Sequence, residues 1–219
     1  MPSSVRLPVL MGALALSAAC GAARAPQPRF ETGDAGAKSR ARADSLRYPY
    51  TVADIEFMSG MIHHHAQATV IAKWAPSHGA SDEMLRLTAR IINAQQDEIA
   101  LMQNWLRDRN QPVPEPNAAG MTMTHAGGTH TMLMPGMLTE EQMRQLDAAR
   151  GEEFDRLFLP LMIQHHRGAV TMVRTLFSSH GAGQDETIFK FANDVAVDQT
   201  TEISRMMQML LARGGLPPE

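Results

Sequence analysis

The chain of 219 residues contains a single cysteine, so no disulfide can form within it. Aromatic residues are scarce, at 5%, which leaves a hydrophobic core to aliphatic side chains and methionine. The net charge is only −3 and no basic stripe is present, which argues against nucleic acid as a partner. Without a cysteine pair, any soft metal ligands must be methionines, with imidazoles beside them.

The N-terminus has the pattern of an export signal. Arg6 precedes an apolar run over residues 7–19 that is too short to cross a bilayer. We predict that residues 1–19 are a signal peptide, and that small residues before Cys20 form a lipidation site. Soluble secretion after a nearby cleavage is the alternative. Either way we expect an exported protein, in the periplasm or tethered to the outer membrane, with membrane contact only through such an anchor.

Periodicity and breakers predict an all-α protein with no strand. Residues 20–47 are rich in Ala, Arg, Pro and Gly without apolar periodicity, and we expect a lipid-anchored or flexible tether. Residues 48–215 form the domain, with paired helical segments at 51–109 and 152–213, a crossover at 110–138 and a short helix at 139–150. Two helical hairpins joined by a long crossover indicate a ferritin-like four-helix bundle.

The two helical segments share one pattern, which suggests an internal duplication. A constant spacing of 101 residues separates Asp54 from Asp155 and the paired histidines of the first segment from those of the second. Downstream, a Gln-x-x-Glu motif recurs with a spacing of 104 residues. The repeated residues with metal-binding chemistry are Met61, His64, His65, Met162, His165, His166, Gln95, Glu98, Gln199 and Glu202.

Helical geometry predicts where these residues meet. If each hairpin turns at its glycines, the histidine pairs lie level with the Gln-x-x-Glu segments, and a pseudo-twofold packing brings both sets to the middle of the bundle. Adjacent histidines point about 100° apart, so we expect one histidine of each pair to face the centre, and we favour His64 and His165. His63 has no counterpart and is expected to be exposed. Asp54 and Asp155, with the glutamines and glutamates, are candidate outer partners or ligands.

Imidazoles with a carboxylate are a donor set for transition metals, and Met61 and Met162 would bias that set toward copper or silver. A purely structural histidine network, in which the Gln and Glu side chains satisfy the rings, is the principal alternative. Catalysis by a di-metal oxidase is the third reading. It is disfavoured because methionine stands where the Glu-x-x-His motif of such sites requires glutamate.

The crossover is a second candidate metal site. It concentrates thioethers and imidazoles in a segment without helical periodicity, at Met121, Met123, His125, His130, Met132, Met134 and Met137. Soft donors on a loop suit capture of Cu(I) or Ag(I). The alternative is that Met132, Met134 and Met137 only pack the crossover onto the bundle.

These motifs also carry a family likeness. The segments FMSGMIHHHAQA, MLMPGMLTEEQM and FDRLFLPLMIQHHRGAV resemble the bacterial domain-of-unknown-function 305 family, which includes CopM-like exported copper-binding proteins. The resemblance spans about residues 48–213. It implies a ferritin-like bundle, an exported location and, for some members, copper binding linked to metal tolerance. The matched positions are Met61, His64, His65, Met134, Met137, Asp155, Met162, His165 and His166.

The sequence therefore predicts an exported protein that binds or buffers copper, with metal ions as partners, possible self-association or a metal-handling partner, and no nucleic acid. A metal-free envelope interaction module and a ferritin-like oxidase are the alternatives.

Overall fold

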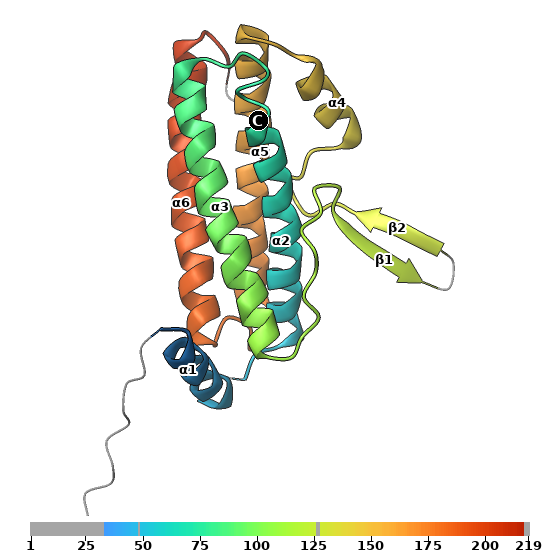
Figure 1. Cartoon of the computed structure of the whole chain (residues 1–219), viewed down its shortest axis with the longest axis vertical. Helices are drawn as coiled ribbons and strands as arrows, with labels where there is room; N and C mark the ends of the chain where they lie inside the picture. The colour runs from blue at the N-terminus through green and yellow to red at the C-terminus, as the bar shows by residue number, and fades with distance from the viewer. Residues whose placement is uncertain (1–32, 48, 126–127, 217–219) are drawn as a thin grey trace, which may run out of the picture. The chain divides into compact units, whose positions relative to one another are not determined.

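The computed structural model describes residues 33–47, 49–125 and 128–216, which all fall in one compact unit, residues 31–219. Two antiparallel hairpins of long helices lie side by side in it (Figure 1). The helices are α2 (Val52–Lys73), α3 (Asp82–Asp108), α5 (Glu152–Ser178) and α6 (Glu186–Ala212). The predicted four-helix bundle with a long crossover is confirmed. The predicted signal peptide and Cys20 lie outside the described residues.

Local sequence signals set the helix starts. Thr51 and Asp54 form a capping box at α2, and Thr139 and Gln142 form another at the short helix α4 (Glu140–Ala148), which packs on α5. Asp185 caps α6 through the backbone N–H groups of its first turn. Within the described part of the chain, no helix has the length and apolar character that crossing a bilayer requires.

Two segments carry regular structure that the sequence analysis did not predict. Residues 33–47, assigned to a flexible tether, form helix α1 (Gly33–Arg47), because alanine, arginine and lysine are strong helix formers even without an apolar stripe. The crossover contains an antiparallel pair, β1 (Met121–His125) and β2 (Gly128–Met132), although no strand was expected. Threonine at every second position has the strand period and a high β-propensity, which the Met and His content obscured.

A polar layer divides the bundle core into two apolar clusters. One cluster contains Phe57–Ile62 of α2 with the adjacent parts of the other three long helices, and the second contains Ala68–Ala75 with theirs. Between them, every long helix contributes buried polar side chains. They are His64, His65, Gln95, His165, His166 and Gln199. The repeated motifs of the sequence therefore lie at one level of the bundle.

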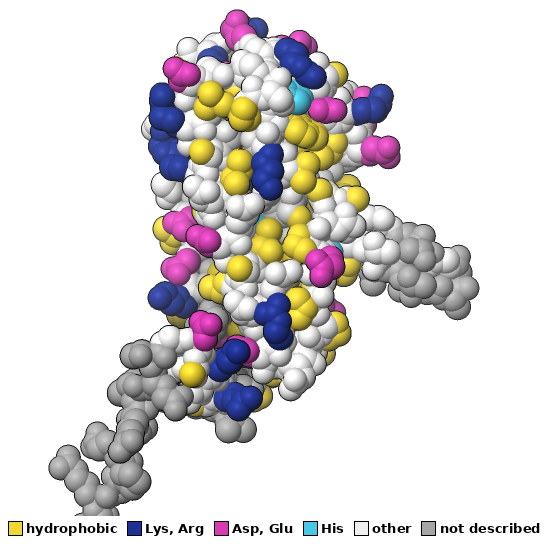
Figure 2. Space-filling view, viewed as in Figure 1, with side chains coloured by type: hydrophobic (Ala, Val, Ile, Leu, Met, Phe, Trp, Pro, Cys, Tyr) yellow, Lys and Arg dark blue, Asp and Glu magenta, His cyan; other side chains and the backbone are white. Residues whose placement is uncertain are grey.

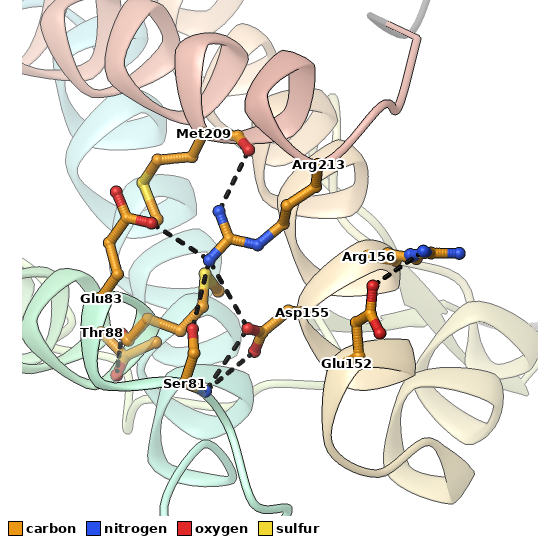
Figure 3. Close-up of polar contacts among 9 residues, drawn as sticks. Ser81, Glu83, Thr88, Glu152, Asp155, Arg156, Met209 and Arg213 are labelled. Carbon is orange, nitrogen blue, oxygen red and sulfur yellow. Dashed lines mark hydrogen bonds and ion pairs between the residues drawn. The ribbon is translucent and has the colours of Figure 1, made fainter.

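Equivalent contacts join the hairpins at both ends. At one end, Asp54 accepts a hydrogen bond from the N–H of Gly183, 2.7 Å away, and Arg109 forms a buried ion pair with Asp185 at 2.5 Å. At the other end, the backbone N–H of Ser81 points at Asp155. Arg213 reaches from the end of α6 to Glu83 and Ser81 in the same cluster (Figure 3). These contacts hold the two hairpins in register.

Candidate metal centre

In the polar layer, two imidazoles from opposite hairpins lie in contact. The ring centroids of His64 and His165 lie 3.8 Å apart, and both side chains are fully buried. His65 and His166 stand beside them, with centroid distances of 6.2 and 6.3 Å to their sequence neighbours. The expected convergence of His64 and His165 at the centre is confirmed. Figure 2 shows only small areas of histidine on the face it draws.

Three of the four rings have one nitrogen held by an acceptor. Nε2 of His65 lies 2.5 Å from a carboxylate oxygen of Glu98, and Nε2 of His166 lies 2.7 Å from Glu202. Nε2 of His64 lies 3.0 Å from the carbonyl oxygen of Pro135. Carbonyl and carboxylate oxygens only accept, so Nε2 carries the proton in each ring. In the neutral rings this leaves the lone pair on Nδ1.

Those Nδ1 atoms have no hydrogen-bond partner. Within the described residues, Nδ1 of His64, His65 and His166 and both nitrogens of His165 are buried and unpaired. An imidazole that ligates a metal usually donates its other N–H to a carboxylate or a backbone carbonyl, which fixes the ring and its tautomer. His64, His65 and His166 have this arrangement. The donor set therefore fits a transition-metal ion.

The glutamines of the layer add further unpaired polar atoms. Both amide atoms of Gln95 and the Oε1 of Gln199 are buried without a partner in the described part of the chain. Buried polar groups of this kind are rare in folded proteins and call for an ion, a water or a functional role. Among the described residues, however, no three His, Cys, Asp or Glu side chains form a ready-made metal cage. The layer thus offers paired imidazoles rather than a closed coordination shell.

Burial keeps the central rings neutral. Desolvation lowers the pKa of His64 and of His165 well below 6.5, and the neighbouring histidines lower both further. A neutral imidazole is the form that binds a metal. At the outer edge of the layer, partial burial and the nearby charges of Glu98, Asp194 and Glu202 raise the pKa of Asp198. This negative edge favours a cation.

The crossover covers the layer from the side of α2 and α5. Gly168 of α5 lies so close to it that a Cβ there would stand 1.9 Å from the carbonyl oxygen of Pro135. Gly136 has φ of +77° and meets the same turn of α5. Two glycines therefore bring the Pro135 carbonyl onto the ring of His64.

The candidate methionines separate into two groups. Met61 and Met162 are fully buried, in different apolar clusters on either side of the layer. Met134 and Met137 are buried against the bundle, which supports the packing role for these two crossover residues. Met132 does not share that role, because 42% of its surface is exposed.

Three expectations for single residues were wrong. Asp54 and Asp155 are neither ligands nor outer partners of the histidines. They bind backbone N–H groups at the helix ends, about 15 Å along the axis from the layer. His63 was expected to be exposed but is 6% exposed, because the crossover packs over it and its ring bonds to the backbone of Asn117.

Residues that hold the crossover were missed by the sequence analysis. Gln67 donates to the carbonyls of Ala118 and Leu138 and accepts from the N–H of Leu138. Gln164 donates to the carbonyl of Gly136. The signal was present, because the repeats differ at these places: Gln67 corresponds to Gly168 and His63 to Gln164. Mismatches on one helix face marked the side that the crossover covers.

The profile of the Domain of unknown function (DUF305) family matches residues 54–210. The chain belongs to the DUF305 family. Among solved structures, this DUF305 protein is similar to one from Streptomyces coelicolor, with 28% identity, a TM-score of 0.63, and coverage of 76% of this chain and 97% of the other. A DUF305 fragment from Deinococcus radiodurans has 28% identity, a TM-score of 0.60 and coverage of 74% and 97%.

CopM in its Cu(I)-bound form is a further similar structure. It has 26% identity and a TM-score of 0.56, over 74% of this DUF305 chain and 98% of CopM. CopM was also solved with Cu(II) and with silver. No functionally curated protein matches the sequence.

Proposed function

We propose that this DUF305 protein binds and buffers copper, and that the ion is held in the histidine layer between the two hairpins. The observation that carries the proposal is the set of buried, unpaired ring nitrogens around the contact of His64 with His165. Three rings are already oriented by acceptors at their other nitrogen, as metal-ligating histidines are.

The residues divide into roles. His64 and His165 are the proposed inner ligands, with His65 and His166 as further ligands that Glu98 and Glu202 orient. Met61 and Met162 are the proposed thioether donors from the adjacent apolar clusters, since soft sulfur donors favour copper and silver over harder ions. The copper and silver forms of CopM support this choice of metals.

We also propose that the protein is exported and that Cys20 anchors it to a membrane. The N-terminal pattern supports export, and the Streptomyces relative is provisionally classed as secreted. An exported copper-binding protein would intercept the ion before it enters the cytoplasm, which suits a role in metal tolerance. Recovery of the mature chain only from the cytoplasmic fraction would contradict this part of the proposal.

The experiment is a titration with Cu(II) of the full chain carrying C20S, which removes the single thiol as a competing ligand. We expect a bound ion whose electron paramagnetic resonance spectrum shows coupling to imidazole nitrogen. The variant H64L/H165L should lose that ion and keep its helical circular dichroism. Leucine fills the same buried space and has no polar atom that needs a partner. H63L is the matched control. It removes a buried histidine outside the His64–His165 contact and should bind as the wild type does.

A metal-free structural role is the second candidate. It is favoured by the carboxylates that already pair His65 and His166. The same titration separates the two, because a purely structural layer predicts no difference in bound copper between the wild type and H64L/H165L. That result, with native helix content in both proteins, would overturn the metal site.

A further inference from the structure

Helix α6 has one face that the rest of the described chain leaves open. The helix runs along the edge of the bundle (Figure 1), and a stripe of exposed residues follows its outer side. Phe189, Val197 and Leu211 of this stripe are each more than half exposed. Large apolar side chains aligned on the outer face of a helix are typical of a surface that meets another molecule. The α6 stripe consists of Phe189, Asn193, Val197, Thr200, Ser204, Gln208 and Leu211.

The stripe is uncharged and keeps one direction along the helix. Its positions recur after eleven residues, as Phe189, Thr200 and Leu211 do. Eleven residues make about three turns of an α-helix, so these side chains stay on one line. No Asp, Glu, Lys or Arg interrupts the line, and the charges of this part of α6 lie on its flank instead.

The polar side chains of the stripe are bonded to their own helix. Asn193 donates to the carbonyl of Phe189, 2.7 Å away. The hydroxyl of Thr200 donates to the carbonyl of Ala196 at 2.6 Å, and that of Ser204 donates to the carbonyl of Thr200 at 3.0 Å. Bonds of this kind satisfy the donors without water. The stripe can therefore be covered without leaving these hydroxyl groups unpaired, which would be costly.

The order of residues along the stripe matches itself when it is reversed. Two antiparallel copies of α6, related by a two-fold axis at Thr200, bring residues equally far before and after position 200 level with each other. Phe189 then faces Leu211 of the second copy, and Thr200 faces itself. We propose that the α6 stripe is the interface of a homodimer, in which two bundles pack through antiparallel α6 helices.

Charges beside the stripe fit this register. Asp194 and Arg205 are eleven residues apart, so they lie on the same flank of it. Arg205 comes five residues after Thr200 and Asp194 comes six before it. The two-fold axis brings the same flank of both copies together, so Arg205 of each copy lies almost level with Asp194 of the other. Arg205 is exposed and forms no ion pair among the described residues, which leaves its guanidinium for this contact. Opposite charges at such flanking positions fix the orientation of paired helices.

A cysteine on the proposed axis tests the register directly. In the full chain carrying C20S, T200C places two thiols opposite each other, and mild oxidation without metal should form a covalent dimer. T171C is the matched control, because Thr171 is exposed on α5 and bonds to its own helix in the same way. It should stay monomeric under the same oxidation. Equal cross-linking of the two variants would indicate random collision and would overturn the interface.

Sedimentation velocity over a series of concentrations, with a chelator present, measures the association itself. The C20S chain should pass from monomer to dimer as its concentration rises, because an interface one helix wide is small. V197D should raise the dissociation constant of the dimer by at least about 100-fold, since two carboxylates would be buried side by side. V52D is the control. Val52 is 68% exposed and Val197 is 63% exposed, so both changes spare the core, but Val52 lies on α2, outside the stripe.

Reversal of the flanking charges tests the proposed ion pair. R205D should raise the dissociation constant by about 10-fold, because it sets like charges against each other. The double variant D194R/R205D should return it to the value of the C20S chain, since the pair is formed again with its signs exchanged. Circular dichroism checks that each variant keeps its helix content.

Three results would overturn the dimer. The first is a C20S chain that stays monomeric at every concentration, which would leave the stripe to a different partner. The second is a dimer that V197D leaves intact, which would place the contact elsewhere. The third is a D194R/R205D protein that associates more weakly than R205D. None of these measurements involves copper, so they stand apart from the titration of the histidine layer.

Discussion

The four histidines of the polar layer differ in the group that contacts the second ring nitrogen. Glu98 and Glu202 lie one turn after Gln95 and Gln199, and that spacing lets them reach His65 and His166. His64 instead donates to a backbone carbonyl supplied by the crossover. His165 has two unpaired nitrogens within the described residues, and we infer that it gains most from a bound ion.

The central histidines make the metal-free protein sensitive to acid. Their folded-state pKa values lie below 6.5, so between those values and 6.5 the unfolded chain binds more protons than the folded one. Stability is therefore complete above pH 6.5 and is lost as the pH falls below it. Each ring contributes roughly 1.4 kcal/mol per pH unit. Urea unfolding at pH 7.5, 6.5 and 5.5 with a chelator present measures this loss.

The variant H64L/H165L is the comparison for that measurement. It should lose most of the pH dependence between 6.5 and 5.5, while the rings of His65 and His166 and the carboxylates of Glu98 and Glu202 remain. An unchanged slope of the unfolding free energy against pH would show that the two central rings do not cause the loss of stability in acid. The range stops at 5.5 because carboxylates begin to titrate below it.

At the scale of elements, the crossover and α5 are joined by a contact that only glycine permits. A Cβ on Gly168 would meet the carbonyl of Pro135, which is backbone and cannot move aside easily. In an ordinary helix interior, glycine to alanine stabilises by about 1 kcal/mol. Here the crossover must shift, and it also carries the acceptor for His64.

We therefore expect G168A to destabilise the protein by about 1–3 kcal/mol, the usual cost of overpacking. The control is G60A in α2, where the nearest atom to a Cβ is the flexible Met134 side chain, at 3.0 Å. That variant should be close to neutral. Denaturant unfolding of both proteins is the measurement, and equal effects would contradict the backbone contact.

At the scale of the molecule, each end of the bundle has one arginine that joins the two hairpins, and the two ion pairs differ in burial. Arg109 and Arg213 end α3 and α6, and each reaches the start of the second helix of the other hairpin. The pair of Arg109 with Asp185 is fully buried, and the guanidinium lies 4.3 Å from the Trp105 ring. Arg213 pairs with Glu83, which is 44% exposed, and also lies 3.7 Å from the buried carboxylate of Asp155.

Because a buried charge without its partner is costly, R109M should destabilise the protein by about 3–5 kcal/mol. R213M should cost less than R109M, because Glu83 is partly exposed and Asp155 keeps the backbone N–H of Ser81 near its carboxylate. Equilibrium unfolding in urea compares them at one pH and ionic strength. Added salt should reduce the loss of stability caused by R213M and leave the loss caused by R109M nearly unchanged. Similar losses in the two variants would contradict the difference in burial.

The sequence by itself determined the four long helices, their hairpin pairing and the level at which the repeated residues meet. Those features depend on helical periodicity, caps and turn glycines, which are local. It also placed the paired histidines on a buried stripe, where their ring nitrogens need polar partners. The antiparallel register then placed Glu98 and Glu202 beside the histidines.

Only the tertiary structure decided which polar residues belong to the layer and which to the ends of the bundle. Asp54 and Asp155 repeat as faithfully as the histidines, but their carboxylates pair with backbone N–H groups of the opposite hairpin, a long-range contact that spacing does not encode. The crossover likewise buried His63 and supplied the Pro135 carbonyl. The pairing of β1 with β2, a contact between two separate segments, was likewise decided only by the tertiary structure.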